Sequence, residues 1–257
     1  MKIRSSILTL IILALIITAG MLCLGQNPYT FLVSNISRPA KRCVVIDPGH
    51  GGYDPGKVGV DNTLEKDINL SIALKLKDIL KENNYQVVMT RMEDIDYSNN
   101  GSGSKKTNDL NSRINIINEN SPAIVISIHQ NSFQDSSVSG AQVFYYGDSA
   151  AANSSDDSTV SGSAINSGSS GKSVSSSHML ADSIQNALIN ELDKSNHRVA
   201  KSNTSYYMLK KTAYPTVIVE CGFLSNSAET KNLNDSAYQQ KTAQAIYSGI
   251  ENYFNQL

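Results

Sequence analysis

Residues 43–52 read CVVIDPGHGG, and this stretch decides the fold of the chain. Its first four residues are apolar and mostly β-branched, and Pro48 and Gly49 end the run, so it predicts a buried β-strand followed by a tight turn. His50 comes directly after that turn. Strand-like and helix-like patterns alternate along the rest of the chain, which is typical of an α/β layer fold.

Further apolar runs supply the other elements of this fold. Strands are expected at 87–89, 124–128 and 216–220, with weaker strand candidates at 141–146 and 206–209. Helical spacing of apolar residues predicts helices along 64–79, 110–117, 180–192 and 243–253. The order of these elements predicts a single layered α/β domain, in which helices flank a mostly parallel (mixed), twisted sheet of about six strands.

The composition narrows the class of protein. The 257 residues carry 22 Lys and Arg against 23 Asp and Glu, a net charge of −1. Nucleic-acid binding needs a basic excess, so nucleic acid is not expected as a partner. Three cysteines are too few for a disulfide scaffold. Because Trp is absent, any sugar-stacking surface must use Tyr or Phe.

The N-terminus predicts export. Lys2 and Arg4 precede an uncharged apolar run at 7–24, which would rise about 27 Å as a helix and so approach the thickness of a bilayer's hydrocarbon core. We favour a signal anchor at 1–25 over a cleaved signal peptide, because the run is long for a signal peptide. The rest of the chain is then exported, either membrane-anchored or secreted after cleavage, and polar residues 26–41 form a tether.

Residues 42–257 form the predicted catalytic domain, which contains one unusual segment. Residues 149–177 include 13 serines in 29 positions. Such a segment buries too little apolar surface to offset its ordering entropy, so it is interpreted as a flexible insertion. A shorter polar loop at 98–107 is expected to behave in the same way.

Residues with catalytic chemistry follow three of the predicted strands. His50 follows the first, His129 the third, and Glu220 ends the last. If these strands are parallel neighbours, their carboxyl ends meet at one edge, which the start of the first helix, with Glu65, can also reach. Two imidazoles and a carboxylate are a catalytic zinc ligand set, and a further carboxylate can act as general base. On spacing alone, however, Glu65 resembles a capping-box partner of Asn62.

Cys221 offers a rival mechanism, a thiolate nucleophile paired with His129. Side chains alternate along a strand, so Glu220 and Cys221 point to opposite faces and only one of them can face the site. A disulfide between Cys43 and Cys221 is not expected, because parallel strands in register would hold them about 13 Å apart.

Four motifs in this order carry a family resemblance. They are VIDPGHGG at 45–52, LEKD at 64–67, SIHQN at 127–131 and VECGFLSN at 219–226. From about residue 43 to residue 254, the chain resembles the zinc-dependent N-acetylmuramoyl-L-alanine amidases. The resemblance implies a single α/β domain that binds one Zn²⁺ through His50, Glu65 and His129 and uses Glu220 as the catalytic residue. It therefore overrides the capping interpretation of Glu65.

The resemblance also implies a substrate, namely the amide bond between N-acetylmuramic acid and L-alanine in peptidoglycan. A short anchored domain without wall-binding repeats is similar to the germination-specific amidases, which remove stem peptides in the spore cortex ahead of muramic δ-lactam formation. Two alternatives stay open: a catalytically silent peptidoglycan-binding protein, and a zinc deacetylase or carboxypeptidase on the same polymer. The ligand set also fits other divalent ions. No pattern identifies a protein activator.

Overall fold

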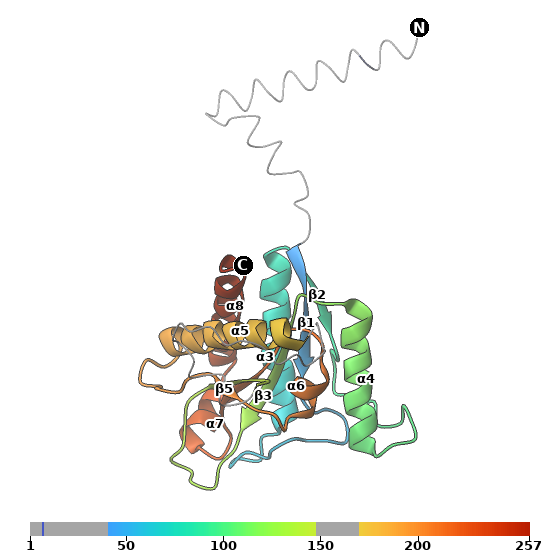
Figure 1. Cartoon of the computed structure of the whole chain (residues 1–257). Coiled ribbons are helices and arrows are strands. Elements are labelled where there is room, and N and C mark those ends of the chain that lie inside the picture. Colours follow the sequence, from blue (N-terminus) through green and yellow to red (C-terminus); the bar gives the residue numbers. More distant parts are fainter. Residues whose placement is uncertain (1–6, 8–40, 148–169) are drawn as a thin grey trace, which may run out of the picture. The chain divides into compact units, whose positions relative to one another are not determined.

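The computed structural model describes residues 41–147 and 170–257, together with Ile7. Residues Lys41–Leu257 form one compact unit (Figure 1). In chain order its elements are β1 (Lys41–Pro48), α3 (Glu65–Glu82), β2 (Tyr85–Met89), α4 (Lys105–Asn120), β3 (Ile124–Asn131), β4 (Gln142–Tyr145), α5 (Ser170–Glu191), β5 (Lys201–Ser202), α6 (Tyr207–Lys211), β6 (Thr216–Phe223), α7 (Ser227–Leu233) and α8 (Ser236–Asn255).

The strands form one mixed sheet of six in the order β2-β1-β3-β6-β4-β5. The four strands β2, β1, β3 and β6 are parallel to one another, and β4 pairs antiparallel with β6. This confirms the predicted mostly parallel sheet. Because β1, β3 and β6 are parallel neighbours, their carboxyl ends lie together at one edge of the sheet.

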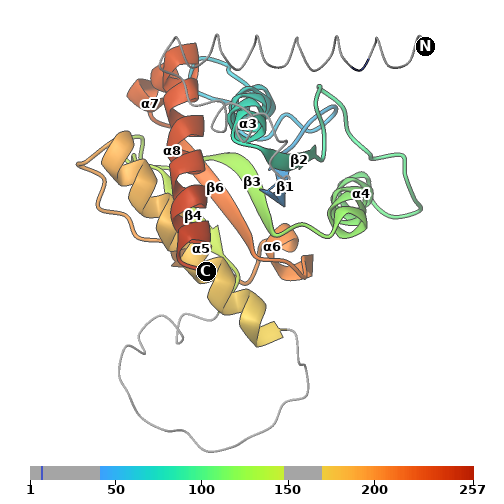
Figure 2. The same ribbon diagram turned by 90° about the horizontal axis from the view of Figure 1, so that it is seen from above.

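Helices cover both faces of the sheet (Figure 2). Apolar side chains of α3, α5 and α8 form the larger core with one face. A smaller cluster on the opposite face joins Val45 and Val125 to Ile114 and Ile117 of α4 and to Met208 of α6. Both faces of β1 and β3 are therefore buried, which explains why these strands are continuous apolar runs rather than alternating ones.

Helix α3 is the element that brings a carboxylate to the sheet edge. Ile68, Ile72 and Leu76 recur at helical spacing and are fully or almost fully buried against the sheet. This packing fixes the direction of the helix, so its first residue, Glu65, points to the carboxyl ends of the strands. Asn83 and Asn84 end the helix, and Asn84 adopts a left-handed φ of +63° before β2 begins.

One predicted strand is wrong. Residues 206–209 were expected as a strand, but Tyr207–Lys211 is the helix α6, and the edge strand β5 lies earlier, at Lys201–Ser202. An apolar run of four residues has no period that separates a strand from a helix. Here Met208 decides the conformation, because it packs into the smaller core cluster beside α4.

Two segments expected to be flexible are partly structured. The last eight residues of the serine-rich stretch, 170–177, belong to α5, and the buried Ser177 hydroxyl accepts the N–H of Thr216 at the start of β6. Residues 149–169 lie outside the described residues. In the 98–107 loop, helix α4 begins at Lys105, and the Asn108 side-chain amide donates to backbone carbonyls of that loop.

The remaining N-terminal predictions are not described by the structure. The predicted signal anchor at 1–25 lies outside the described residues except for Ile7, and the tether at 26–41 lies outside them except for Lys41, which opens β1. Among the helices of the described ranges, none combines the length and the apolar character that crossing a bilayer requires.

Candidate active site

The structure brings the predicted strand-end residues together. Gly49, which precedes His50, donates its N–H to Ile128 O at 2.9 Å, so the loop after β1 lies directly against the end of β3. In the pairing of β3 with β6, His129 is the register partner of Glu220. The His50 and His129 rings pack edge to face with their centroids 5.0 Å apart. Three of the four predicted residues thus meet at one edge of the sheet.

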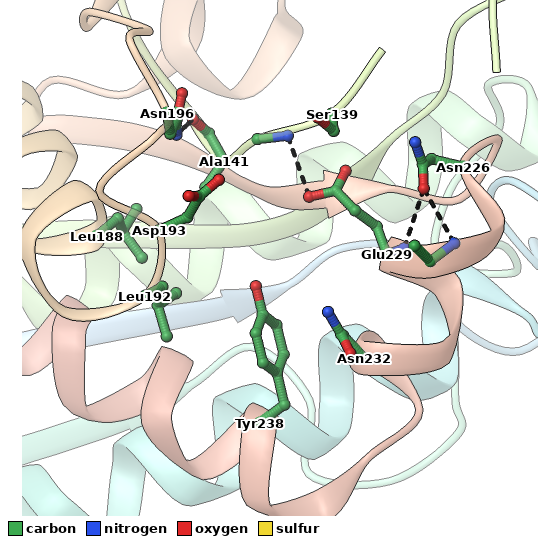
Figure 3. A pocket seen from close by; sticks show the side chains of 12 residues that line it. Ser139, Ala141, Leu188, Leu192, Asp193, Asn196, Asn226, Glu229, Asn232 and Tyr238 are labelled. Carbon is green, nitrogen blue, oxygen red and sulfur yellow. Dashed lines mark hydrogen bonds between the residues drawn. The ribbon is translucent and has the colours of Figure 1, made fainter. Parts of the chain in front are cut away.

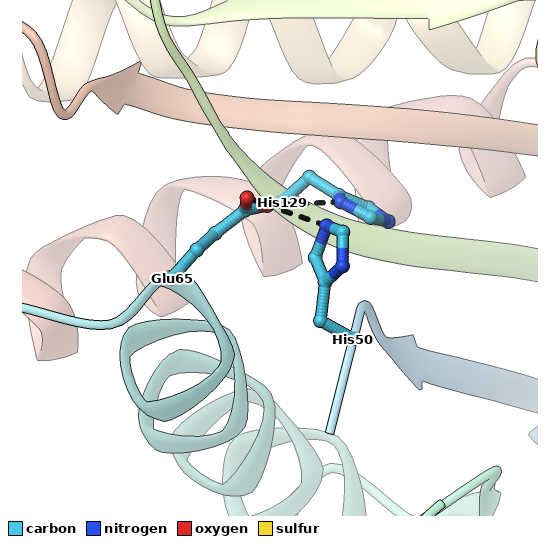
Figure 4. A group of neighbouring side chains, drawn as sticks. All are labelled: His50, Glu65 and His129. Atoms are coloured by element: carbon cyan, nitrogen blue, oxygen red, sulfur yellow. Dashed lines mark hydrogen bonds and ion pairs between the residues drawn. The ribbon is translucent and has the colours of Figure 1, made fainter. Parts of the chain in front are cut away.

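Glu65 completes this cluster, and it does so as the first residue of α3. Its side chain is 2% exposed, and its carboxylate contacts both imidazoles from one side (Figure 4). Oε2 is 3.3 Å from His50 Nε2, and Oε1 is 3.0 Å from His129 Nδ1. The capping interpretation is wrong, because the N-cap residue is Leu64 and no side chain caps the helix.

Neutral donors hold the Glu65 carboxylate in place. The backbone N–H of Gln130 donates to Oε1 at 3.0 Å, and that of Lys57 donates to Oε2 at 2.8 Å. Asn69, one helical turn further along α3, adds a contact to Oε1 at 3.3 Å and is itself held by Gln130. Burial opposes ionisation, but hydrogen bonds from both histidines outweigh it and hold the pKa of Glu65 far below its usual value.

His50 is fixed from its other ring nitrogen. Asp54 Oδ2 lies 2.8 Å from His50 Nδ1, which leaves Nε2 directed at Glu65. Burial lowers the pKa of His50, but the contacts with Glu65 and Asp54 more than compensate and raise it. An imidazole whose second nitrogen contacts a carboxylate is the usual arrangement of a metal-binding histidine.

His129 packs against a glycine that has no room for a side chain. A Cβ added at Gly49 would lie 2.1 Å from Cε1 and 2.2 Å from Nε2 of the His129 ring. Contacts of that length do not occur between real atoms, so the ring occupies the space that any other residue at position 49 would need. Position 49 must therefore be glycine, because His129, a candidate metal ligand, fills the space beside it.

This arrangement fits a divalent cation. One ligand atom from each of His50, Glu65 and His129 lies within 4.8 Å of the other two. Two imidazoles and one carboxylate are the protein ligands of many catalytic zinc sites, which leave further positions for water and substrate. The described residues thus contain a His50-Glu65-His129 group that could bind a metal.

Glu220 lies beside this group with an unpaired oxygen. Its side chain is 6% exposed, and among the described residues its Oε2 has no hydrogen-bond partner. Burial is the largest cause that raises the pKa of Glu220 to about 7. A carboxyl group with such a pKa can both accept and donate a proton near neutral pH. Burial and the charges of Glu220 and Glu65 also raise the pKa of Tyr206 to about 12.

Cys221 faces away from this chemistry, as strand alternation predicts. It is 1% exposed and belongs to the apolar core under α3, α5 and α8. Burial raises the pKa of its thiol far above the ordinary value, so a thiolate nucleophile at this position is disfavoured. Cys43 and Cys221 are both free.

Two residues that hold the ligands, Asp54 and Asn69, are not among those predicted from the sequence. Asp54 and Asn69 each lie four positions after a ligand candidate, His50 and Glu65 respectively. In the helix, this spacing places two side chains on one face and could have indicated Asn69. In the loop, the Asp54 contact depends on a turn in which Gly51 and Asp54 pair, and side-chain spacing alone does not reveal such a turn.

A separate cavity of about 310 Å³ lies between the loop before β4, the end of α5, α7 and α8 (Figure 3). Its lining includes Glu229, whose Oε1 accepts the N–H of Gly140 and whose Oε2 accepts the N–H of Phe223. This carboxylate therefore joins the last residue of β6 to the loop before β4. None of the four predicted site residues lines the cavity.

Comparisons with known proteins identify the family of this chain. A family model described as N-acetylmuramoyl-L-alanine amidase matches residues 44–252. The germination-specific N-acetylmuramoyl-L-alanine amidase of Bacillus subtilis is 34% identical over 218 residues, which cover 84% of this chain and 81% of the relative.

Solved structures show the same similarity. The CwlD amidase from Clostridioides difficile, in complex with the GerS lipoprotein, is 36% identical with a TM-score of 0.70, over 84% of this chain and 100% of that chain. The amidase AmiC2 of Nostoc punctiforme is 27% identical with a TM-score of 0.64, over 85% of this chain and 99% of that chain. The chain therefore belongs to the N-acetylmuramoyl-L-alanine amidase family.

Proposed function

We propose that this chain is a zinc-dependent hydrolase that cleaves the amide bond between N-acetylmuramic acid and L-alanine in peptidoglycan. The observation that carries the proposal is the Glu65 carboxylate in contact with two imidazoles, with the unpaired Oε2 of Glu220 beside them. Membership of the amidase family supports the choice of bond.

In this proposal His50, Glu65 and His129 hold the metal. When bound, zinc supplies a Lewis acid that polarises the scissile carbonyl and lowers the pKa of water. Gln130, Lys57 and Asn69 keep Glu65 in place, and Asp54 directs Nε2 of His50 toward Glu65. The ligands are therefore pre-organised, which limits the entropy lost when the metal and the substrate bind.

Glu220 is the proposed proton carrier. It takes a proton from the water that attacks the lactyl carbonyl and delivers it to the amine of L-alanine as the amide bond breaks. Its burial favours this role, because a desolvated carboxylate is a stronger base than one in water. Among the described residues Oε2 makes no hydrogen bond that would compete with this role.

The relatives suggest where the enzyme acts. We propose that it removes stem peptides in the spore cortex ahead of muramic δ-lactam formation, because a relative that is 34% identical to this chain is named a germination-specific amidase. It is then exported and faces the cell wall, with its N-terminal segment as the membrane anchor. The solved CwlD–GerS complex supports a lipoprotein as a partner for this chain as well.

The test is a digest of purified peptidoglycan analysed by mass spectrometry, with the wild-type enzyme and the Glu220→Gln variant. The wild type should release peptides that begin with L-alanine, and Glu220→Gln should lower this activity by at least about 10³-fold while zinc stays bound. Glu82→Gln, on the exposed end of α3, serves as the matched control and should keep full activity.

Other products would identify the alternatives. Loss of acetyl groups or of C-terminal residues would indicate a deacetylase or a carboxypeptidase. Binding without any release would indicate a silent wall-binding protein. Full activity in Glu220→Gln would remove Glu220 from its proposed role.

A further inference from the structure

Two buried arginines lie beneath the loop that carries His50. Arg91 follows β2 and is 2% exposed, and Arg113 lies in α4 and is 1% exposed. A buried guanidinium is costly unless its N–H groups are paired. The partners of these two side chains therefore indicate what the side chains hold in place.

Those partners include the backbone carbonyls of three consecutive residues. Arg113 donates from Nη1 to Pro48 O at 2.8 Å and from Nη2 to His50 O at 2.6 Å. Arg91 donates from Nε to Pro48 O at 3.0 Å and from Nη2 to Gly49 O at 3.0 Å. Every carbonyl from residue 48 to residue 50 thus accepts a guanidinium N–H.

Carboxylates fix Arg113 from its other side. Asp109 accepts from Nε at 2.8 Å, and Asp47 accepts from Nη1 at 2.9 Å. Both acceptors are themselves placed by regular structure, Asp47 in β1 and Asp109 in α4. The guanidinium fork therefore connects the core of the domain to the backbone of the loop, which a single lysine ammonium could not do.

The loop needs such support because His50 has an unusual backbone conformation. Its φ is +61°, in the left-handed region that residues with a Cβ rarely adopt. A conformation of this kind persists only where the surroundings fix it. Only two side-chain torsions separate the backbone of His50 from its ring, so the backbone largely sets where Nε2 points.

We infer that Arg91 and Arg113, here called the arginine clamp, are positioning residues that hold the His50 backbone in the conformation that directs its imidazole at the metal. The inference rests on the proposed function, since it requires a metal at His50. Metal–ligand distances tolerate only about 0.2 Å of error. A small movement of this loop should therefore lower the affinity of the site for zinc.

The competing explanation is that the arginines only stabilise the fold. A purely stabilising pair lowers the melting temperature when it is weakened, but it leaves the metal affinity of the folded protein unchanged. Metal affinity compared at matched stability therefore separates the two explanations.

The experiment measures the Zn²⁺ affinity of metal-stripped protein by competition with a chromophoric chelator, together with the visible absorption of the Co²⁺-loaded form. The variant is Arg113→Lys, which keeps the charge beside Asp47 and Asp109 but cannot reach both carbonyls. Its Zn²⁺ affinity should fall 10- to 100-fold, and its Co²⁺ spectrum should change. Arg91→Lys should also lower the Zn²⁺ affinity, and this variant provides the test if Arg113→Lys does not fold.

Ile117→Ala is the matched control. Ile117 lies one turn after Arg113 in α4, is fully buried, and contacts the smaller core cluster rather than the loop. It should lower the melting temperature and leave the Zn²⁺ affinity within twofold of wild type. Wild-type affinity in a folded lysine variant, or an equal loss in Ile117→Ala, would overturn the clamp. A wild-type protein that binds no zinc would instead overturn the metal site, and the clamp with it.

Discussion

The Gly49→Ala substitution adds one methyl group and tests whether the position of the His129 ring limits activity. The new Cβ would lie 2.1 Å from Cε1 of that ring, whereas ordinary contact begins at 3.4 Å. The φ of Gly49 is not in the left-handed region, so backbone strain of that kind does not confuse the result. The substitution should therefore displace the ring of one proposed metal ligand, His129, without otherwise straining the backbone.

The size of the effect follows from this geometry. The ring must retreat by about 1.3 Å to reach ordinary contact, several times the 0.2 Å that a metal–ligand distance tolerates. A misplacement of about 1 Å in a catalytic site costs roughly 100-fold in rate. We expect kcat/KM on peptidoglycan fragments to fall by at least about 100-fold and the zinc affinity to fall with it.

The assay compares Gly49→Ala with Gly59→Ala in the same loop. At Gly59 the nearest atoms to an added Cβ are 3.2 Å away and belong to the side chains of Asp61 and Thr230, which can adjust. Gly59→Ala should stay within about threefold of wild type. If Gly49→Ala kept wild-type kcat/KM and zinc affinity, the reasoning that the His129 ring must occupy this space would be refuted.

Two further predictions concern the core beneath the site. Cys221→Ala should keep wild-type amidase activity and lose about 1 kcal/mol of unfolding free energy, because Cys221 is a buried core residue; loss of turnover at unchanged stability would revive the thiolate mechanism. Asp47→Asn should lower the free energy of unfolding by about 3 kcal/mol, because it breaks a buried ion pair with Arg113. Burial alone would raise the pKa of Asp47, but the Arg113 charge and hydroxyl hydrogen bonds lower it below its usual value. Its stabilising contribution is therefore present above about pH 4 and is lost as the pH falls through the folded-state pKa. In urea titrations of metal-free protein between pH 5 and pH 2, the wild type should lose more stability than Asp47→Asn, and equal slopes would contradict the assignment.

Local patterns predicted most of the sheet and three of the four site residues, whereas the ligand role of Glu65 came only from the family resemblance. The β-branched runs at 124–128 and 216–220 form buried strands, and each is followed or ended by its chemical group at the carboxyl end. Once β1, β3 and β6 are parallel neighbours, the meeting of His50, His129 and Glu220 follows. Local spacing wrongly suggested a capping role for Glu65, because its partners His50 and His129 lie 15 and 64 residues away from it in the sequence.

The remaining features depend on contacts that no local pattern records. Residues 206–209 became part of a helix because Met208 meets a cluster built by other elements. The arginine clamp joins residues 91 and 113 to a loop more than 40 positions earlier, and nothing in the spacing of these arginines predicts that contact. The serine-rich stretch enters α5 at residue 170, and its Ser177 hydroxyl accepts a backbone N–H of β6, a contact that its composition does not predict.

The central claim is that His50, Glu65 and His129 together bind one zinc ion. The most direct measurement is the metal content of the purified protein after equilibration with limiting Zn²⁺, by elemental mass spectrometry, for the wild type and for Glu65→Ala. We expect one zinc per wild-type chain and a large loss in the variant. A wild-type chain without zinc, or a Glu65→Ala variant that retains one equivalent at unchanged affinity, would contradict it.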